Sequence, residues 1–408
     1  MTQFIDTLVG IFQSSGFARF GEPGGYLYAI MICVGCFLLY LAIVKEFEPL
    51  ILLPMAFGMI LANLPGSGII HMQYFVGDGL EHPMWVEILN NGGLADMLYM
   101  GVKLGIYPPL IFLGIGTMTD FAPLISNPKS LLLGAAAQFG IFGTYMGARL
   151  LTATGLVDFT QKQSAAIAII GGADGPMVLF GTLMMKPELF VSVSIIAYLY
   201  LSLTYAGYPY IIKALVPKKY RGIDIEFDMP QVSQKAKFIF IVVVCLLLCL
   251  LLPVAAPLML SFFLGMAVKE AKILPYQELL EGGITSFSSL FLGLVLGCLC
   301  EASTILNPTV GIILILGILA LAISAVGGIA GGWLMYFVGK KTGKSFNPAV
   351  GIAGISCMPT TTKLAQHAVE EENPFAIVIP IAMGCNISGV IVSAIAAGVF
   401  VATIGLVL

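Results

Sequence analysis

One aspartate lies in the middle of an apolar stretch, beside residues that interrupt helices. Asp174 belongs to the segment 171–176, which reads Gly-Gly-Ala-Asp-Gly-Pro, and the flanking segments 165–170 and 177–180 are apolar. A carboxylate at membrane depth costs about 2.5–3.5 kcal/mol on insertion scales, and Gly and Pro interrupt regular helix. Membrane transporters combine a buried charge with broken backbone to build an ion site. The alternative is an aspartate in a short loop outside the membrane, which the apolar flanks disfavour.

A second interrupted segment, residues 347–363, supplies oxygen atoms and one cation. Asn347 and Ser356 carry side-chain oxygens, the intervening glycines and prolines leave backbone carbonyls free, and Lys363 ends the segment. Hard cations prefer oxygen ligands. Asp174, Asn347, Ser356 and nearby carbonyls therefore predict a Na⁺ or H⁺ site. Lys363 is either a counter-ion or anion ligand in that site, or a lysine whose head group reaches the membrane surface.

Polar side chains follow each interrupted segment. Tyr200 lies after the first, where its hydroxyl could donate a hydrogen bond or a proton, although tyrosine is also common at membrane interfaces. Asn386 and Ser393 lie after the second. A tyrosine alone is therefore weak evidence, and the residues after the second segment only add polar groups to the helix that follows it.

The composition is that of a membrane protein. The 408 residues are 59% apolar and 10% charged, with a mean hydropathy of +1.00, whereas soluble domains carry about 25% charged residues. The net charge of −3 gives no overall basic surface for nucleic acid. The eight cysteines lie mostly in apolar runs without a histidine cluster, which favours packing over metal binding. Because no nucleotide-binding loop of the GxxxxGK[ST] type occurs, any pumping must use an ion gradient or a partner's chemistry.

Apolar runs predict an all-α polytopic protein with about nine to ten transmembrane helices and two re-entrant or broken hairpins. The hairpins are expected near 160–183 and 347–366. The predicted organisation is residues 1–104 as N-terminal helices with an amphipathic connection, 105–212 as a first repeat, 213–237 as a basic loop and 238–408 as a second repeat. The predicted spans are 26–44, 49–64, 105–122, 129–152, 188–212, 237–255, 255–268, 283–302, 308–338 and 374–404.

Charge distribution predicts the orientation. The loop 213–237 holds six Lys and Arg residues against three acids, so the positive-inside rule places it in the cytoplasm. The stretch 65–102 has acidic residues and no Lys or Arg, and it falls outside in the same layout. Counting spans from the basic loop places both chain ends outside.

A weak internal repeat occurs at an offset of 180 residues. Asn127-Pro128 matches Asn307-Pro308, and the segment around Gly171 matches that around Gly351. With the predicted orientation, the two copies have opposite directions in the membrane. This favours an inverted-topology repeat with a site between two broken segments. Chance matching in an apolar chain is the alternative.

The chain resembles the membrane-embedded beta subunit of the biotin-dependent, sodium-pumping decarboxylases, from about residue 40 to its end. This family acts on oxaloacetate, methylmalonyl-CoA or glutaconyl-CoA. The segment 171–176 together with Gln138-Phe139-Gly140 is the most specific part of the resemblance. Further matching stretches are 47–50, 53–54, 107–114, 119–121, 127–129, 134–140 and 347–359.

The resemblance implies a mechanism and partners. A carboxyltransferase (alpha) subunit moves CO₂ from the substrate to biotin on a carrier protein, and carboxybiotin docks at the cytoplasmic side of the beta subunit. There it is decarboxylated with consumption of a proton from the outer side, and Na⁺ is exported. A small single-span gamma subunit, a homo-oligomer within the complex and a multi-pass location in a bacterial inner (plasma) membrane are also implied. The substrate is chosen by the carboxyltransferase, so all three acids stay open.

The resemblance also assigns roles to individual residues. The family's essential membrane aspartate falls on Asp174 and its functional tyrosine on Tyr200. Lys363 stands where the family usually has Arg; the lysine keeps the positive charge but cannot make the bidentate contacts of a guanidinium group. Carboxybiotin is expected at Lys363 and Asn386. The Na⁺ ligands implied are Asp174, Asn347, Gly351 and Ser356.

Two other functions compete with this interpretation. A stand-alone secondary carboxylate or Na⁺/H⁺ transporter could use the same inverted-repeat plan without a carrier protein. A passive membrane anchor for a soluble enzyme is the other alternative, but an anchor needs neither Asp174 nor broken hairpins.

Overall fold

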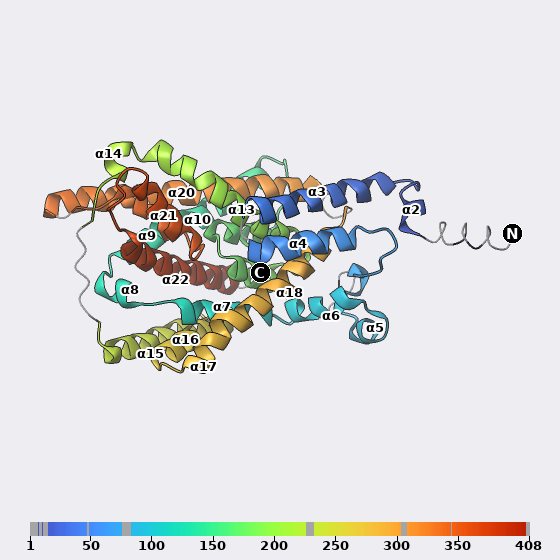
Figure 1. Cartoon of the computed structure of the whole chain (residues 1–408), viewed down its shortest axis with the longest axis horizontal. Helices are drawn as coiled ribbons and strands as arrows, with labels where there is room; N and C mark the ends of the chain where they lie inside the picture. Colours follow the sequence, from blue (N-terminus) through green and yellow to red (C-terminus); the bar gives the residue numbers. More distant parts are fainter. Residues whose placement is uncertain are drawn as a thin grey trace. The chain divides into compact units, whose positions relative to one another are not determined.

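The computed structural model describes residues 15–46, 49–75, 83–225, 232–302, 308–343 and 345–404, together with Thr7 and Gly10. Within these residues every regular element is a helix (Figure 1). The chain divides into two compact units, Met1–Tyr107 with Ser286–Ile312 (unit 1) and Pro108–Thr285 with Ile313–Leu408 (unit 2). The expected all-α polytopic fold is confirmed.

Unit 1 is held together by close helix packing. A Cβ added at Gly58 on α4 would lie 2.1 Å from the Leu294 carbonyl oxygen, so the α4 and α18 backbones touch there. The Asn63 side chain donates to the Cys300 carbonyl oxygen at 2.8 Å and ties the ends of the same two segments. The elements are α2 (Gly16–Arg19), α3 (Gly25–Val44), α4 (Pro49–Ala62), η1 (Met72–Tyr74), α5 (Trp85–Asn91), α6 (Leu94–Lys103) and most of α18 (Thr285–Cys298).

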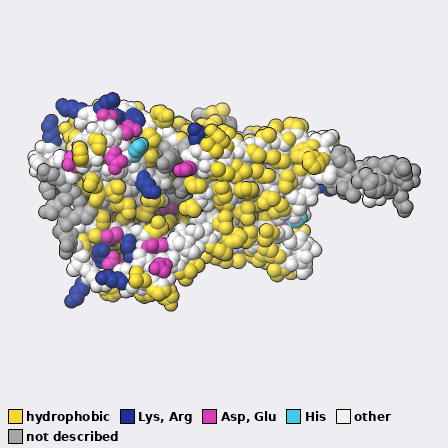
Figure 2. Space-filling view, viewed as in Figure 1, with side chains coloured by type: hydrophobic (Ala, Val, Ile, Leu, Met, Phe, Trp, Pro, Cys, Tyr) yellow, Lys and Arg dark blue, Asp and Glu magenta, His cyan; other side chains and the backbone are white. Residues whose placement is uncertain are grey.

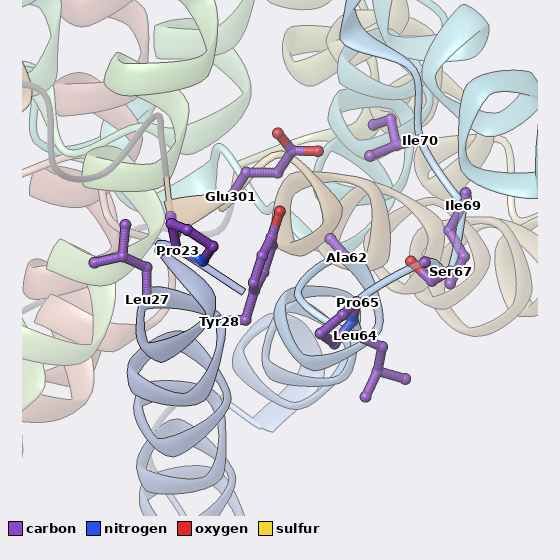
Figure 3. A pocket seen from close by; sticks show the side chains of 14 residues that line it. Pro23, Leu27, Tyr28, Ala62, Leu64, Pro65, Ser67, Ile69, Ile70 and Glu301 are labelled. Atoms are coloured by element: carbon purple, nitrogen blue, oxygen red, sulfur yellow. The ribbon is translucent and has the colours of Figure 1, made fainter. Parts of the chain in front are cut away.

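A hollow of about 320 Å³ opens in unit 1. Tyr28 and Glu301 extend into it from different segments (Figure 3). Neither of the two interrupted segments contributes a residue to its lining.

Unit 2 contains both interrupted segments. Its first half comprises α7 (Tyr107–Met118), α8 (Ala122–Ser126), α9 (Ser130–Ala137), α10 (Phe139–Ala153), α11 (Gln161–Ala168), η2 (Ile169–Gly172), α12 (Gly175–Met185), η3 (Pro187–Leu189), α13 (Phe190–Leu215) and α14 (Lys218–Arg221). Its second half comprises α15 (Gln234–Leu251), η4 (Pro253–Ala255), α16 (Ala256–Glu270), α17 (Leu274–Glu278), η5 (Leu279–Ile284), most of α20 (Pro308–Thr342), η6 (Pro348–Gly354), α21 (Thr360–Glu370) and α22 (Ile379–Ile404).

Each of the ten predicted spans coincides with a helix or a run of helices. In the described part of the chain, seven helices are long and apolar enough to cross a membrane, or eight if one bent pair is a single span. That pair is α6 with α7, bent by 67°. If the two helices form one span, the span begins at Leu94, inside the stretch that was predicted to be an amphipathic connection, and not at residue 105. α4, with 14 residues, is shorter than a full span.

The helix α15 shows how these helices meet the membrane. Only Ile241, Cys245 and Leu248 along it are buried. Large apolar side chains such as Phe238, Val243 and Leu250 are exposed instead, on a helix with no acidic residue. Such a surface is stable only against lipid or another apolar surface.

Charged side chains gather at one end of unit 2. Figure 2 shows Lys, Arg, Asp and Glu together at the end where Figure 1 labels α14, α15 and α21. Lys237 at the start of α15 bridges Asp120 at 2.9 Å and Glu270 at 3.0 Å, and Arg221 pairs with Glu372. This end contains the described part of the basic loop that was predicted to be cytoplasmic.

The two interrupted segments pack in matching ways. α13 contacts both α12 and α21, and α22 contacts the same two helices. The short helix η2 packs on α10 while η6 packs on α9. The succession of short helix, break, short helix and long helix therefore occurs twice, as the 180-residue repeat predicts. Whether the copies are inverted in the membrane stays a prediction.

Glycines allow η6 to lie against α20. A Cβ on Gly351 would fall 2.0 Å from the Gly328 carbonyl oxygen, and one on Gly328 would fall 2.5 Å from that of Gly351. A Cβ on Gly332 would meet the Pro348 carbonyl oxygen at 2.2 Å. Backbone meets backbone at these points, so no side chain can move aside.

The substitution Gly328→Ala should therefore destabilise the protein by about 1–3 kcal/mol, the usual cost of overpacking a close contact. The measurement is the thermal midpoint of the detergent-purified protein. Gly311→Ala is the matched control, because Gly311 lies on the same helix and its added Cβ meets nothing within 4 Å. An equal midpoint for the two variants would contradict the close packing.

Candidate functional site

The chain breaks its helix immediately before Asp174. Ala173 takes a left-handed backbone conformation (φ 54°), which ends η2 and turns the chain into α12. Asp174 is the N-cap of α12, and its Oδ1 accepts from the Met177 backbone N–H at 3.3 Å. Its side chain therefore faces the positive end of the helix dipole, which favours the ionised form.

The second carboxylate oxygen of Asp174 meets a neutral donor from another helix. The Ser393 hydroxyl on α22 lies 3.3 Å from Oδ2 and 2.9 Å from the Val390 carbonyl oxygen, and its one proton is donated to either of these acceptors. The aspartate is only 6% exposed, and among the described residues no Lys, Arg or His pairs with it. A buried carboxylate without a basic partner is costly unless a proton or a cation neutralises it.

Ser356 joins the two interrupted segments. Its hydroxyl donates to the carbonyl oxygen of Gly172, two residues before Asp174. Asn386 on α22 holds the same stretch from the other side, donating to the carbonyl oxygens of Ala353 at 3.1 Å and Ile355 at 2.8 Å. The structure thus brings Asp174, Ser356 and Asn386 to the neighbouring breaks.

Asn347 has a different environment. Its Oδ1 accepts from the Ala349 backbone N–H at 3.0 Å and caps η6, and its Nδ2 donates to the carbonyl oxygens of Arg221 at 2.6 Å and Ile223 at 2.9 Å. The side chain is fully buried in these contacts. It anchors the start of η6 to the segment after α14, and none of its hydrogen bonds goes to a residue near Asp174.

The remaining predicted residues are placed as follows. Gly351 is buried where η6 meets α20. Lys363 lies on α21 with an exposed side chain and belongs to no ion pair of the described residues. Tyr200 lies on α13, and its side chain is outside the described residues.

A small cavity of about 10 Å³ borders Asp174. Ala173, Thr204 and Leu321 contribute to its lining. This is about the space that one water molecule needs, so the site can take a small ion and excludes a substrate. In the described part of the chain, His, Cys, Asp and Glu form no group of three or more that could hold a metal, which sets this site apart from a transition-metal centre.

Sequence reasoning missed two contributors to this region. Ser393 was noted as polar but not assigned to the aspartate, and Gln138 was noted only as part of a family motif. Both are buried polar residues in apolar helical surroundings. That pattern is the signal that could have found them, because such residues are retained inside membranes mainly where they have partners or a function.

Comparison with known proteins identifies the family. The profile described as the Na⁺-transporting oxaloacetate decarboxylase beta subunit matches residues 28–404. The carboxybiotin decarboxylase of Malonomonas rubra is 50% identical over 92% of this chain and 92% of its own length. The methylmalonyl-CoA decarboxylase subunit beta of Propionigenium modestum is 38% identical over 98% of this chain and its whole length.

A third relative carries another substrate in its name. The oxaloacetate decarboxylase beta chain 2 of Salmonella typhi is 36% identical over 97% of this chain and 98% of its own length. The match of the family profile to nearly the whole chain agrees with the resemblance expected from the sequence. The chain belongs to the family of beta subunits of Na⁺-transporting decarboxylases.

Proposed function

We propose that this chain decarboxylates carboxybiotin presented by a partner subunit and uses the reaction to export Na⁺ across the membrane, with Asp174 as the ion-carrying group. The observation that carries the proposal is a carboxylate buried at a helix break, bound only by neutral donors. The family membership supplies the chemistry, and the site supplies the place where a small cation can be held.

In the proposed reaction the bond between the ureido nitrogen of biotin and its carboxylate carbon breaks. CO₂ leaves, and the electron pair returns to the nitrogen, which takes up a proton. Lys363 is the candidate to attract the carboxylate, since it is an exposed cation on α21. Tyr200 is the other candidate for this step, as a hydrogen-bond donor to the biotin group. Asn386 was expected to take part as well, but its amide hydrogens already go to backbone carbonyls, so it is placed better to hold the second interrupted segment than to bind biotin.

Asp174 couples this chemistry to the ion. With Na⁺ bound, the carboxylate is neutralised and can face a low-dielectric region, whereas the empty ionised form is costly there. Protonation of Asp174 releases Na⁺, and the proton consumed by biotin arrives from the outer side by this route. Ser356 holds the second segment against the break before Asp174, while Gly351, expected as an ion ligand, packs against α20. Asn347 is placed better to position η6 than to bind Na⁺.

The proposal includes the partners. They are a carboxyltransferase (alpha) subunit with a biotin carrier, a single-span gamma subunit and further copies of this chain. The membrane is a bacterial inner membrane with surrounding lipid. The names of the relatives include more than one substrate, so the acid or acyl-CoA that supplies CO₂ is chosen by the partner.

The first prediction concerns Asp174→Asn, which keeps the shape and removes the charge. Na⁺ stimulation of carboxybiotin decarboxylation by the purified complex should fall at least about 100-fold, because a buried ion without its counter-charge loses ~3 kcal/mol or more. The control is Asp158→Asn, at an exposed aspartate of the same unit. A retained Na⁺ response in Asp174→Asn would exclude Asp174 as the carrier.

The second prediction separates Lys363 from the ion site. Lys363→Ala should raise KM for the carboxylated carrier about five-fold, as expected for the loss of one exposed charge contact of ~1 kcal/mol. Half-saturation by Na⁺ should stay unchanged, and Lys363→Arg should restore KM because it keeps the charge. Decarboxylation kinetics at varied carrier concentration give both quantities. An unchanged KM in Lys363→Ala would remove Lys363 from the binding of carboxybiotin.

A further inference from the structure

Gln138 is a buried amide at the junction of α9 and α10. It is 1% exposed, and its Nε2 donates to the Gly389 carbonyl oxygen on α22 at 3.2 Å. A carbonyl oxygen can only accept, so this contact fixes which end of the amide is nitrogen. The Oε1 atom therefore points the other way, and it accepts no hydrogen bond from any described residue.

The free oxygen of Gln138 faces the break before Asp174. A Cβ added at Gly172 would lie 3.3 Å from Gln138 Oε1 and 3.4 Å from the Cβ of Ser393. The Ser393 hydroxyl in turn lies 3.3 Å from Asp174 Oδ2. Gln138 Oε1 and the Cβ of Ser393 therefore both lie beside Gly172, whose carbonyl oxygen receives the Ser356 hydroxyl.

An unpartnered amide oxygen in a buried place is unfavourable, because it has lost its hydrogen bonds to water and gained none in the protein. A cation bound at Asp174 would satisfy this oxygen and add a neutral ligand to the carboxylate. Backbone and amide carbonyl oxygens are the ligands that hard cations take besides carboxylates. Gly172 has no side chain, so no Cβ lies between Gln138 and Ser393.

We infer that Gln138 supplies its Oε1 as a ligand to the Na⁺ carried by Asp174. This inference rests on the proposed function and deepens it, because it names an ion ligand on α9–α10, outside both interrupted segments. The amide is held in place by Gly389 on α22, the helix that also carries Ser393. Ion binding would thereby join α22, the α9–α10 junction and the first interrupted segment.

The test uses the purified complex and two variants. Gln138→Met keeps the approximate length and removes the oxygen, and Gln138→Glu keeps an oxygen at the same position. Both variants lose the Nε2 donor to Gly389, so a difference between them isolates the oxygen. Two quantities are measured at constant ionic strength with K⁺ as replacement: the Na⁺ concentration for half-maximal decarboxylation, and the rise of the thermal midpoint with Na⁺. The second readout does not depend on activity, since a ligand of the folded state stabilises it.

For Gln138→Met we expect half-saturation by Na⁺ to rise about ten-fold or more, the size of one lost polar contact to a charged group. The midpoint in K⁺ should fall by the same amount in the Met and Glu variants, because both lose the Nε2 donor to Gly389. The Na⁺ concentration for half-maximal decarboxylation by Gln138→Glu should stay within about three-fold of that of the unmodified protein. Thr182→Val is the control, because it also removes a buried oxygen that has no hydrogen-bond partner among the described residues. It should change neither the Na⁺ half-saturation nor the rise of the midpoint with Na⁺.

An unchanged Na⁺ half-saturation in Gln138→Met would overturn the inference. An equal rise in the Met and Glu variants would also overturn it, because Gln138 would then act only through Gly389. Asp174→Asn in the same assay separates the two proposals. If it abolishes the Na⁺ response while Gln138→Met does not alter it, only the role of Gln138 fails; if Asp174→Asn keeps the response, the proposed function fails.

Discussion

A carboxylate buried without a basic partner is the constraint on which the rest of this structure depends. Asp174 accepts hydrogen bonds from one backbone N–H and one serine hydroxyl, and no Lys, Arg or His of the described residues forms an ion pair with it. Such a group is stable only when protonated or bound to a cation. In the proposed function, the pump alternates between its Na⁺-bound and its protonated form.

Backbone packing supports this site. The two short helices η2 and η6 end where their carbonyl oxygens receive the hydroxyls and amides of neighbouring helices, such as Ser356 and Asn386. Glycines on α20 and η6 let the backbones touch, which leaves no room for water between them. Non-helical backbone at membrane depth is tolerated when it is buried in protein in this way.

The sequence predicted the local features of this fold well. Long apolar runs and Gly-Pro breaks are signals within a few residues, so the ten helical regions and both interrupted segments were found where the structure has them. The side-chain environments could not be predicted equally well. Asn347 turns toward the segment after α14, and Gln138 toward Gly172, because helices more than a hundred residues away fix their directions. The bent α6–α7 pair was not predicted as one span, because its amphipathic first half lacks a continuous apolar run.

The central claim is that decarboxylation of carboxybiotin drives Na⁺ through unit 2. The most direct measurement is ²²Na⁺ uptake into liposomes that contain the purified complex, started by adding oxaloacetate, methylmalonyl-CoA or glutaconyl-CoA. Uptake is expected with one of these substrates, and it should be lost when avidin blocks biotin. Uptake that ignores all three substrates and avidin, and instead follows an imposed pH or carboxylate gradient, would contradict the account and favour a stand-alone secondary transporter.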